Sequence, residues 1–418
     1  MLKDEQGLSI TTDSAEAIAA INRFIQASLT YGKDAESAIL QAIAADPHCA
    51  IAYAYAAAYY LSQENAIDRQ QAHSHLHSLR LLHPNVSQRE QLYIDSVITW
   101  AKGDIQQAIA DHEAIATQFP QDLLSVQQGQ YHYFYRGDAV RLLQLAEKVR
   151  SAHSNNPYWL GMLAFGLEQC HRLAEAEAMG RRATELNRLN PWAHHAVAHV
   201  LETQNRIDEG IDWMQSLSDT WEGCNSMLYT HNWWHVALFY LQQGDWEKVR
   251  SLYHTQVWGR ARKQTPKDQV GAISLLLRLD LHGLNLEAEW QDLVPYLLPR
   301  IHEHALPFQD LHYVYALARS GQIGRAHEML VSMVAFTQTL NWAERQRWNN
   351  IAIPAARGLI AHAMGNWQEA ITHLQPVLPW LSQLGGSHTQ QALFEQIYRH
   401  TCQHQASPGN HAVASKAA

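Results

Sequence analysis

The stretch Gly103-Asp-Ile-Gln-Gln-Ala108 decides the fold, because its opening Gly-Asp pair returns 34 residues later as Gly137-Asp138. Further steps of 34 residues reach His171-Arg172 and Asn205-Arg206, and each of these positions stands between two runs with helical apolar spacing. A period of this length with a central turn is typical of the tetratricopeptide helix hairpin. The sequence therefore predicts a stack of helical hairpins.

The series of turns continues in both directions from this stretch. The further predicted turns are Gly244, Gly283, Gly321 and Gly365 on the C-terminal side, and Asn65 and Gly32 on the N-terminal side. No segment alternates β-branched residues over any length, so we expect no sheet. The prediction is an all-α fold, a tetratricopeptide-like α-solenoid of about ten helical hairpins wound into a strongly curved superhelix. We expect residues 1–402 to form one repeat domain and residues 403–418 to form a flexible tail.

Composition excludes several classes of protein. Apolar residues make up 47% of the 418 residues and charged residues only 17%, with a net charge of −9. A nucleic-acid partner is not expected, because that class shows a basic face. A membrane span is not expected, because no apolar run approaches the roughly 18 residues it needs. The four cysteines lack CxxC spacing, and the N-terminus lacks the apolar segment of a signal peptide, so the expected location is cytoplasmic.

Histidine is abundant, with 26 residues, and four of them form two matched pairs. The first pair lies in Trp192-Ala-His-His195-Ala-Val-Ala-His199, and the second in His231-Asn-Trp-Trp-His235. Residues four apart share one face of a helix. On the repeat register the two pairs fall on adjacent first helices, on or next to the face that lines the concave groove. We therefore expect four imidazoles in one small volume.

Other side chains are predicted to share this groove. The expected lining residues are Tyr131, Tyr158, Glu168, Glu202 and Trp234. A later stretch, Phe308-Gln-Asp310-Leu-His312, opens another first helix, and in a tightly wound superhelix it would approach the four histidines.

These motifs resemble the tetratricopeptide-repeat protein 38 family over most of the chain, best from about Leu163 to Phe394. The resemblance rests on the two histidine stretches, on Phe308–His312 and on Gln383-Leu-Gly-Gly-Ser387. It implies an α-solenoid and marks the positions of family motifs, but it implies no reaction. The residues at those positions are His195, His199, His231, His235, Asp310 and His312, whereas His194 and Cys224 have no counterpart.

Our leading interpretation is a concave pocket that binds a small molecule and transforms it by acid–base or metal-assisted chemistry, with hydrolysis or elimination as the broadest classes. The six family-motif residues would be its catalytic set. No cofactor is identified. A divalent transition metal on His195, His199, His231 and His235 remains an alternative, although Ala196 and Asn232 stand where a metalloprotease motif has glutamate.

Two other interpretations stay open. One is a non-catalytic scaffold that holds a protein or peptide partner, with a homodimer as a further option. The other is a structural layer of hydrogen-bonded histidines. A nucleophile formed by Cys224 and His231 is less favoured than an inert loop cysteine. In Gly385-Gly386-Ser387, helix capping completed by Gln390 is favoured over anion binding.

Overall fold

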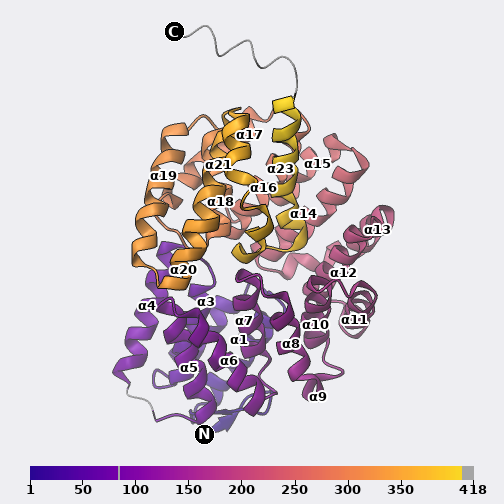
Figure 1. The fold of residues 1–418 in the computed structure, drawn as a ribbon. Helices are drawn as coiled ribbons and strands as arrows, with labels where there is room; N and C mark the ends of the chain where they lie inside the picture. Colours follow the sequence, from indigo (N-terminus) through magenta and orange to yellow (C-terminus); the bar gives the residue numbers. More distant parts are fainter. Residues whose placement is uncertain (83–84, 407–418) are drawn as a thin grey trace. The chain divides into compact units, whose positions relative to one another are not determined.

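The computed structural model describes residues 1–82 and 85–406, and most of them are helical (Figure 1). The chain divides into two compact units, Met1–Asp268 and Gln269 onward. The boundary falls inside α16 (Pro266–Leu281). The prediction of a single repeat domain over residues 1–402 stays a prediction. Of the predicted tail, residues 403–406 belong to the last helix, and the remainder lies outside the described residues.

The helices of the first unit are α1 (Ala15–Leu29), α2 (Ala35–Ala45), α3 (Ala50–Leu61), α4 (Ala66–Leu81), α5 (Gln88–Ala101), α6 (Ile105–Gln118), α7 (Leu123–Tyr135), α8 (Ala139–Lys148), α9 (Arg150–His153), α10 (Pro157–Gln169), α11 (Leu173–Leu186), α12 (Pro191–Thr203), α13 (Ile207–Leu217), α14 (Ser226–Gln243) and α15 (Trp246–Leu252), with a 3-10 helix η1 (Ser218–Gly223) and a π-helix η2 (Tyr253–Val257).

The second unit continues with α17 (Glu287–Leu297), η3 (Leu298–Arg300), α18 (Pro307–Arg319), α19 (Ile323–Phe336), η4 (Thr337–Thr339), α20 (Trp342–Arg347), the π-helix η5 (Trp348–Ala352), α21 (Ile353–Ala363), α22 (Trp367–Leu374), η6 (Leu378–Leu384) and α23 (His388–Ala406). Within the described residues, no helix is both long enough and apolar enough to cross a membrane.

The predicted turns are confirmed by their backbone angles. The residues with φ between +55° and +81° at these turns are Gly103, Gly137, His171, Asn205, Gly244, Gly283, Gly321 and Gly365. This left-handed conformation ends one helix and lets the chain reverse, which is why glycine dominates the series. Each turn joins the two helices of a hairpin. First helices of successive hairpins pack against one another, as α10 does with α12 and α12 with α14. The fold is therefore the predicted all-α, tetratricopeptide-like solenoid.

Two predictions at the N-terminal end were wrong in detail. The left-handed residues of the first two turns are Tyr31 and Glu64, one position before the predicted Gly32 and Asn65. Asn65 instead caps α4, since its side chain accepts a hydrogen bond from the Asp68 amide at 2.9 Å. A glycine or asparagine beside a turn does not fix which residue takes the positive φ.

The expectation of no sheet also needs a small correction. Strands β1 (Leu2–Lys3) and β2 (Ser9–Ile10) pair antiparallel. The Asp4 side chain accepts hydrogen bonds from the amides of Gln6 and Leu8 at 3.0 and 2.9 Å, and this forms the turn between the strands. Ile10 is fully buried and belongs to the core cluster of the first unit, so it attaches the hairpin to the helices.

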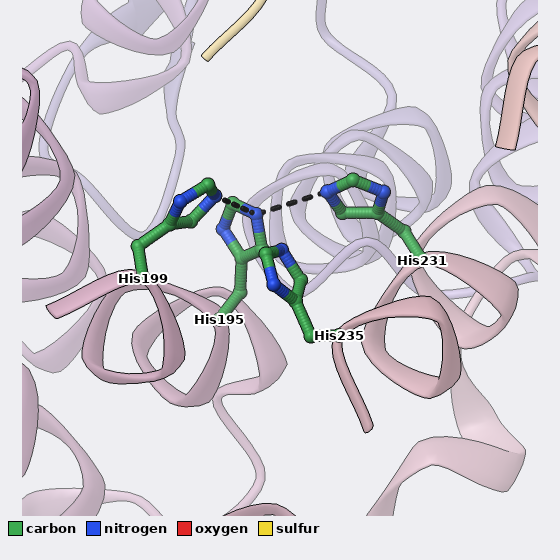
Figure 2. A group of neighbouring side chains, drawn as sticks. All are labelled: His195, His199, His231 and His235. Atoms are coloured by element: carbon green, nitrogen blue, oxygen red, sulfur yellow. Dashed lines mark hydrogen bonds between the residues drawn. The ribbon is translucent and has the colours of Figure 1, made fainter. Parts of the chain in front are cut away.

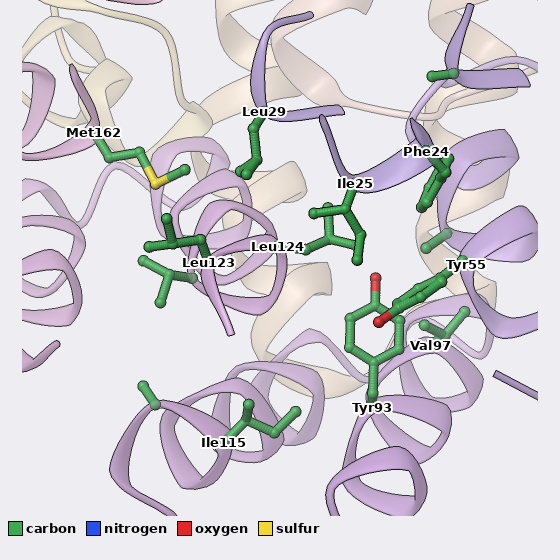
Figure 3. Packing of buried hydrophobic residues seen from close by; sticks show 14 of the residues in the cluster. Phe24, Ile25, Leu29, Tyr55, Tyr93, Val97, Ile115, Leu123, Leu124 and Met162 are labelled. Carbon is green, nitrogen blue, oxygen red and sulfur yellow. The ribbon is translucent and has the colours of Figure 1, made fainter. Parts of the chain in front are cut away.

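Helix α1 packs into the core of the first unit. Its residues Phe24, Ile25 and Leu29 belong to one buried cluster with Tyr55, Tyr93 and Leu124, which come from α3, α5 and α7 (Figure 3). The Phe24 and Tyr55 rings lie 5.4 Å apart, and the Tyr55 and Tyr93 rings meet edge to face at 4.8 Å. Burial of such side chains stabilises a fold by roughly 1.5–3 kcal/mol each. Helix α1 therefore adds several buried side chains to the core of the first unit.

A buried ion pair connects α5 to the start of α7. The Nε of Arg89 donates to Asp122 Oδ2 at 2.7 Å, and both side chains are almost completely buried. Arg89 also donates to the Tyr55 hydroxyl. Asp122 caps α7 by accepting from the Ser125 amide at 3.0 Å. Each charge therefore depends on the other for compensation.

We predict that Arg89→Met destabilises the first unit by about 3–5 kcal/mol, because it leaves the Asp122 carboxylate buried without its cation. Urea unfolding followed by circular dichroism measures the change. Arg172→Met is the matched control, since the ion pair of Arg172 with Glu175 is exposed and should contribute little. Equal midpoints for the two variants would contradict this account of the buried pair.

Candidate metal centre

Helices α12 and α14 carry the two histidine pairs. Pro191 opens α12, with Asn190 as its cap, and the Asn225 side chain caps α14 by accepting from the Leu228 amide at 3.0 Å. The two helices are first helices of successive hairpins and pack against each other. The i,i+4 spacing places each pair on one face, and the packing makes the two faces meet.

The four imidazoles converge as the sequence predicts (Figure 2). The Nε2 atom of His195 lies 3.0 Å from Nε2 of His199 and 3.1 Å from Nε2 of His231. The His235 ring centre is 4.4 Å from that of His199 and 5.0 Å from that of His195. One nitrogen from each of the four rings lies within 4.8 Å of the other three.

Burial favours the neutral form of two of these rings, His195 and His231. His195, His199 and His235 are almost fully buried, and His231 is partly buried. Burial lowers the pKa of His195 well below its usual value, and the neighbouring His199 and His231 lower it further. Burial also lowers the pKa of His231 to about 4. A neutral imidazole has a nitrogen lone pair, which is the form that binds a metal ion.

The acidic side chain of Glu202 contacts one of the imidazoles. Glu202 Oε2 lies 3.3 Å from Nδ1 of His235, an interaction that favours the tautomer with the lone pair on Nε2. Glu168 is buried on α10, and this burial raises its pKa to about 8, with a smaller contribution from the charge of Glu202. Burial thus favours the protonated form of Glu168, and Glu202 is the acidic side chain in contact with His235.

Aromatic rings enclose the imidazoles. The rings of Trp192 and His195 stack at 4.6 Å, and those of Trp234 and His231 stack at 5.1 Å. The Phe165 ring lies 5.5 Å from that of His195. Tyr31, from the first interhelical turn, stacks on Trp192 at 5.0 Å. An apolar shell of this kind keeps water from the nitrogens and strengthens their interaction with a cation.

The spacing of the nitrogens fits a tetrahedral ion. Metal–nitrogen bonds of about 2.0–2.1 Å imply nitrogens about 3.3 Å apart at the corners of the tetrahedron. The contacts of His195 at 3.0 and 3.1 Å lie near this value, and all four nitrogens lie within 4.8 Å of one another. Four imidazoles suit zinc, copper, nickel or iron rather than calcium or magnesium.

The other predicted groove residues have partners within the first unit. The Tyr131 hydroxyl donates to Glu64 Oε1 at 2.7 Å. The Tyr158 hydroxyl accepts from the Gln26 side chain of α1 and from Asn187 Nδ2, the latter at 3.1 Å. The Tyr158 hydroxyl thus hydrogen-bonds to α1. The small-molecule pocket proposed from these residues stays a prediction.

Asp310 and His312 lie in the second unit, where each has partners of its own. Asp310 Oδ2 is 2.6 Å from Nδ1 of His304. His312 Nδ1 is 2.8 Å from the Phe308 carbonyl oxygen, and burial lowers the pKa of His312 to about 4. Their predicted role in completing the four-histidine site stays a prediction.

Two less favoured sequence interpretations find no support in the surroundings of these residues. Burial raises the pKa of Cys224 to about 12, so its thiol is a poor nucleophile at neutral pH. Ser387 and Gln390 form a capping box, because the Ser387 amide donates to Gln390 Oε1 at 2.9 Å and the Gln390 amide donates back to Ser387 Oγ. This confirms the capping interpretation.

The sequence did not predict the roles of two residues near the four histidines, Tyr31 and His194. Tyr31 was not predicted, since it belongs to the first hairpin and nothing in its spacing indicates a contact 161 residues away with Trp192. His194 points to the other side of α12, where its Nδ1 accepts from Trp221 Nε1 at 3.2 Å. Its role is structural, in keeping with its lack of a counterpart in the resemblance.

No protein-family model matches the chain. A curated relative, the TPR repeat-containing protein YvcD of Bacillus subtilis strain 168, is 26% identical over 161 residues. The alignment covers 36% of this chain and 32% of that relative, so it spans about a third of the relative's length.

Solved structures with similar helical arrangements include the Cut9–Hcn1 hetero-tetramer of the APC/C, at 11% identity over 94% of this chain and 79% of that chain, with a TM-score of 0.42. Another is the human IFIT1 dimer with m7Gppp-AAAA, at 12% identity over 96% of this chain and 97% of that chain, with a TM-score of 0.41. Likenesses at this level carry no argument about function. The fold is thus that of a tetratricopeptide-like helical repeat. The narrower resemblance to the tetratricopeptide-repeat protein 38 family stays a prediction.

Proposed function

We propose that the first unit binds a divalent transition metal through His195, His199, His231 and His235. The single observation that carries this proposal is the presence of four imidazole nitrogens within 4.8 Å of one another. A structural layer of histidines needs only pairs of donors and acceptors. Here one atom, Nε2 of His195, faces the Nε2 atoms of two other rings. That convergence suits a cation shared among the nitrogens.

The number of ligands favours a binding centre over a catalytic one. Catalytic zinc sites keep one coordination position for water or substrate, whereas structural sites use four protein ligands. Four histidines from α12 and α14 would close the coordination shell of a tetrahedral ion and fasten the two hairpins together. A hydrolytic role would need one imidazole to leave or an ion that accepts a fifth ligand.

We predict that the purified protein, stripped with a chelator and titrated with zinc, binds about one equivalent tightly. His231→Ala and His195→Ala should each weaken this binding by more than tenfold, because three imidazoles cannot close the shell. Isothermal titration calorimetry and elemental analysis measure the affinity and the stoichiometry.

The matched control is the double variant His73→Ala, His77→Ala. It removes an exposed histidine pair of the same spacing from α4 of the same unit. Zinc affinity should be unchanged in this variant. Equal loss in the α4 variant, or full zinc binding without His195 and His231, would contradict the proposed centre.

We predict that Glu202→Gln also weakens zinc binding. The carboxylate orients the His235 ring without being one of the four ligands, and loss of such a partner weakens metal affinity by about 10–100-fold. Competition with a zinc-sensitive dye measures the change. An unchanged affinity would show that Glu202 does not position His235, although the four-histidine centre itself would stand.

A second candidate function is binding of a protein partner, the common use of the extended surfaces of helical repeats. The observation that favours it is the exposure of two tryptophans in the second unit, Trp342 at 75% and Trp380 at 54%. Tryptophan is enriched in protein interfaces and dominates their binding energy. The partner interpretation concerns the second unit and is independent of the metal centre.

We predict that the double variant Trp342→Ser, Trp380→Ser loses a partner that the wild-type chain retains in affinity purification. Its zinc content and melting temperature should match those of the wild type. The Arg172→Met variant, which alters an exposed site in the first unit, is the control and should keep the partner. If the tryptophan variant and the wild type retained identical sets of proteins, the two tryptophans would have no role in partner binding.

A further inference from the structure

Asp310 belongs to a hydrogen-bonded series in the second unit that the metal centre does not use. Its Oδ2 atom lies 2.6 Å from Nδ1 of His304, and Nε2 of the same imidazole lies 2.8 Å from the hydroxyl of Ser332 on α19. The side chains of Asp310 and His304 are each 2% exposed. Ser332 is partly exposed to solvent.

The order carboxylate, imidazole, hydroxyl is the order of a nucleophilic serine site. An Nδ1–H that donates to the carboxylate leaves the lone pair on Nε2, where it can accept the serine proton. Distances of 2.6 and 2.8 Å are within the reach that such a site requires. We propose that Ser332, His304 and Asp310 form a serine nucleophile site that acts on carboxylic esters.

The Ser332 hydroxyl does not hydrogen-bond to a carbonyl of its own helix. Hydroxyls within helices commonly donate to a carbonyl three or four residues earlier, as Thr184 and Thr372 do here. Ser332 instead meets two imidazoles, since Nδ1 of the exposed His302 also lies 2.9 Å from its oxygen. With His304 accepting the proton, His302 is the group on the solvent side that can donate to the same oxygen.

The backbone of His304 provides a second observation. Its φ is +48°, in the left-handed region, which non-glycine residues seldom occupy. Four other non-glycine residues share this feature, and all of them sit at the turns of hairpins: Tyr31, Glu64, His171 and Asn205. His304 lies instead in the loop between η3 and α18, where the conformation directs its ring between Asp310 and Ser332. Such strain gathers at functional sites.

The surroundings of His304 are apolar on one side. The Phe336 ring lies 5.2 Å and the Trp348 ring 6.1 Å from the imidazole. Burial raises the pKa of Asp310 to about 6, an effect that the hydrogen bond from His304 opposes. A shielded Asp–His pair beside a serine that solvent can reach is the arrangement in which an imidazole acts as general base.

The reaction balances without a cofactor. Ser332 Oγ attacks the ester carbonyl carbon while its proton moves to Nε2 of His304. The bond from carbon to the alcohol oxygen breaks, and the alcohol leaves with that proton. Water then gives its proton to His304 and attacks the acyl-serine, which releases the carboxylic acid and returns the proton to Ser332. Asp310 is a positioning residue, because it acts through the imidazole.

The test is labelling with a fluorophosphonate probe, in which Ser332 Oγ bonds to phosphorus and fluoride leaves. Mass spectrometry of the full chain should find the label on Ser332. Labelling should be abolished in Ser332→Ala and slowed by about 10²-fold or more in His304→Gly and Asp310→Asn. Glycine suits the positive φ of residue 304, so this variant removes the base without backbone strain.

Three controls keep the result interpretable. Added imidazole should restore labelling to His304→Gly, which a merely structural histidine would not allow. Ser216→Ala, at an exposed helical serine of the first unit, should label as the wild type does. Melting temperatures show whether each variant is folded. Absence of label on Ser332 of the wild type, or equal rates in folded His304→Gly and wild type, would overturn the proposal, whether or not zinc is bound.

Discussion

The left-handed residue at the turn of each hairpin is the constraint on which the arrangement depends. It ends a first helix at a fixed place, so that the second helix folds back and the next first helix starts at a repeatable position. Because Asn205 and Gly244 both turn in this way, α12 and α14 lie side by side and pack against each other. The meeting of His195 and His199 with His231 and His235 is a consequence of that register.

The turns and the histidine pairs could be predicted from the sequence because both are local patterns. A residue with positive φ and a spacing of four each depend on a few neighbouring residues. The bond of Tyr158 with Gln26 and the stacking of Tyr31 on Trp192 could not be predicted, since they depend on where α1 packs after many hairpins have formed. The residue with positive φ was also not predicted at the first two turns, where it is Tyr31 and Glu64 rather than the neighbouring Gly32 and Asn65. Ser332 gave no signal, because both of its partners, His304 and His302, come from a loop 28 and 30 residues earlier in the chain.

Burial decides the chemistry of the imidazoles in the first unit. It lowers the pKa values of His195 and His231, so that these rings are neutral in the range where free histidines begin to charge. Neutral rings in an apolar shell are poor partners for anionic groups and good ligands for a soft or borderline cation. The same shell argues against general acid–base work by His195, since a base whose conjugate acid is so strongly disfavoured accepts protons weakly near neutral pH.

The second unit shows what a different neighbour does to the same side chain. His304 is as buried as His195, but its two ring nitrogens face a carboxylate and a hydroxyl rather than other imidazoles. A carboxylate on one nitrogen stabilises the imidazolium that forms when the other takes a proton, whereas imidazole neighbours oppose it. The neighbours of His195 therefore favour binding of a cation, and those of His304 favour transfer of a proton. Both sites are built on helical hairpins of the same type.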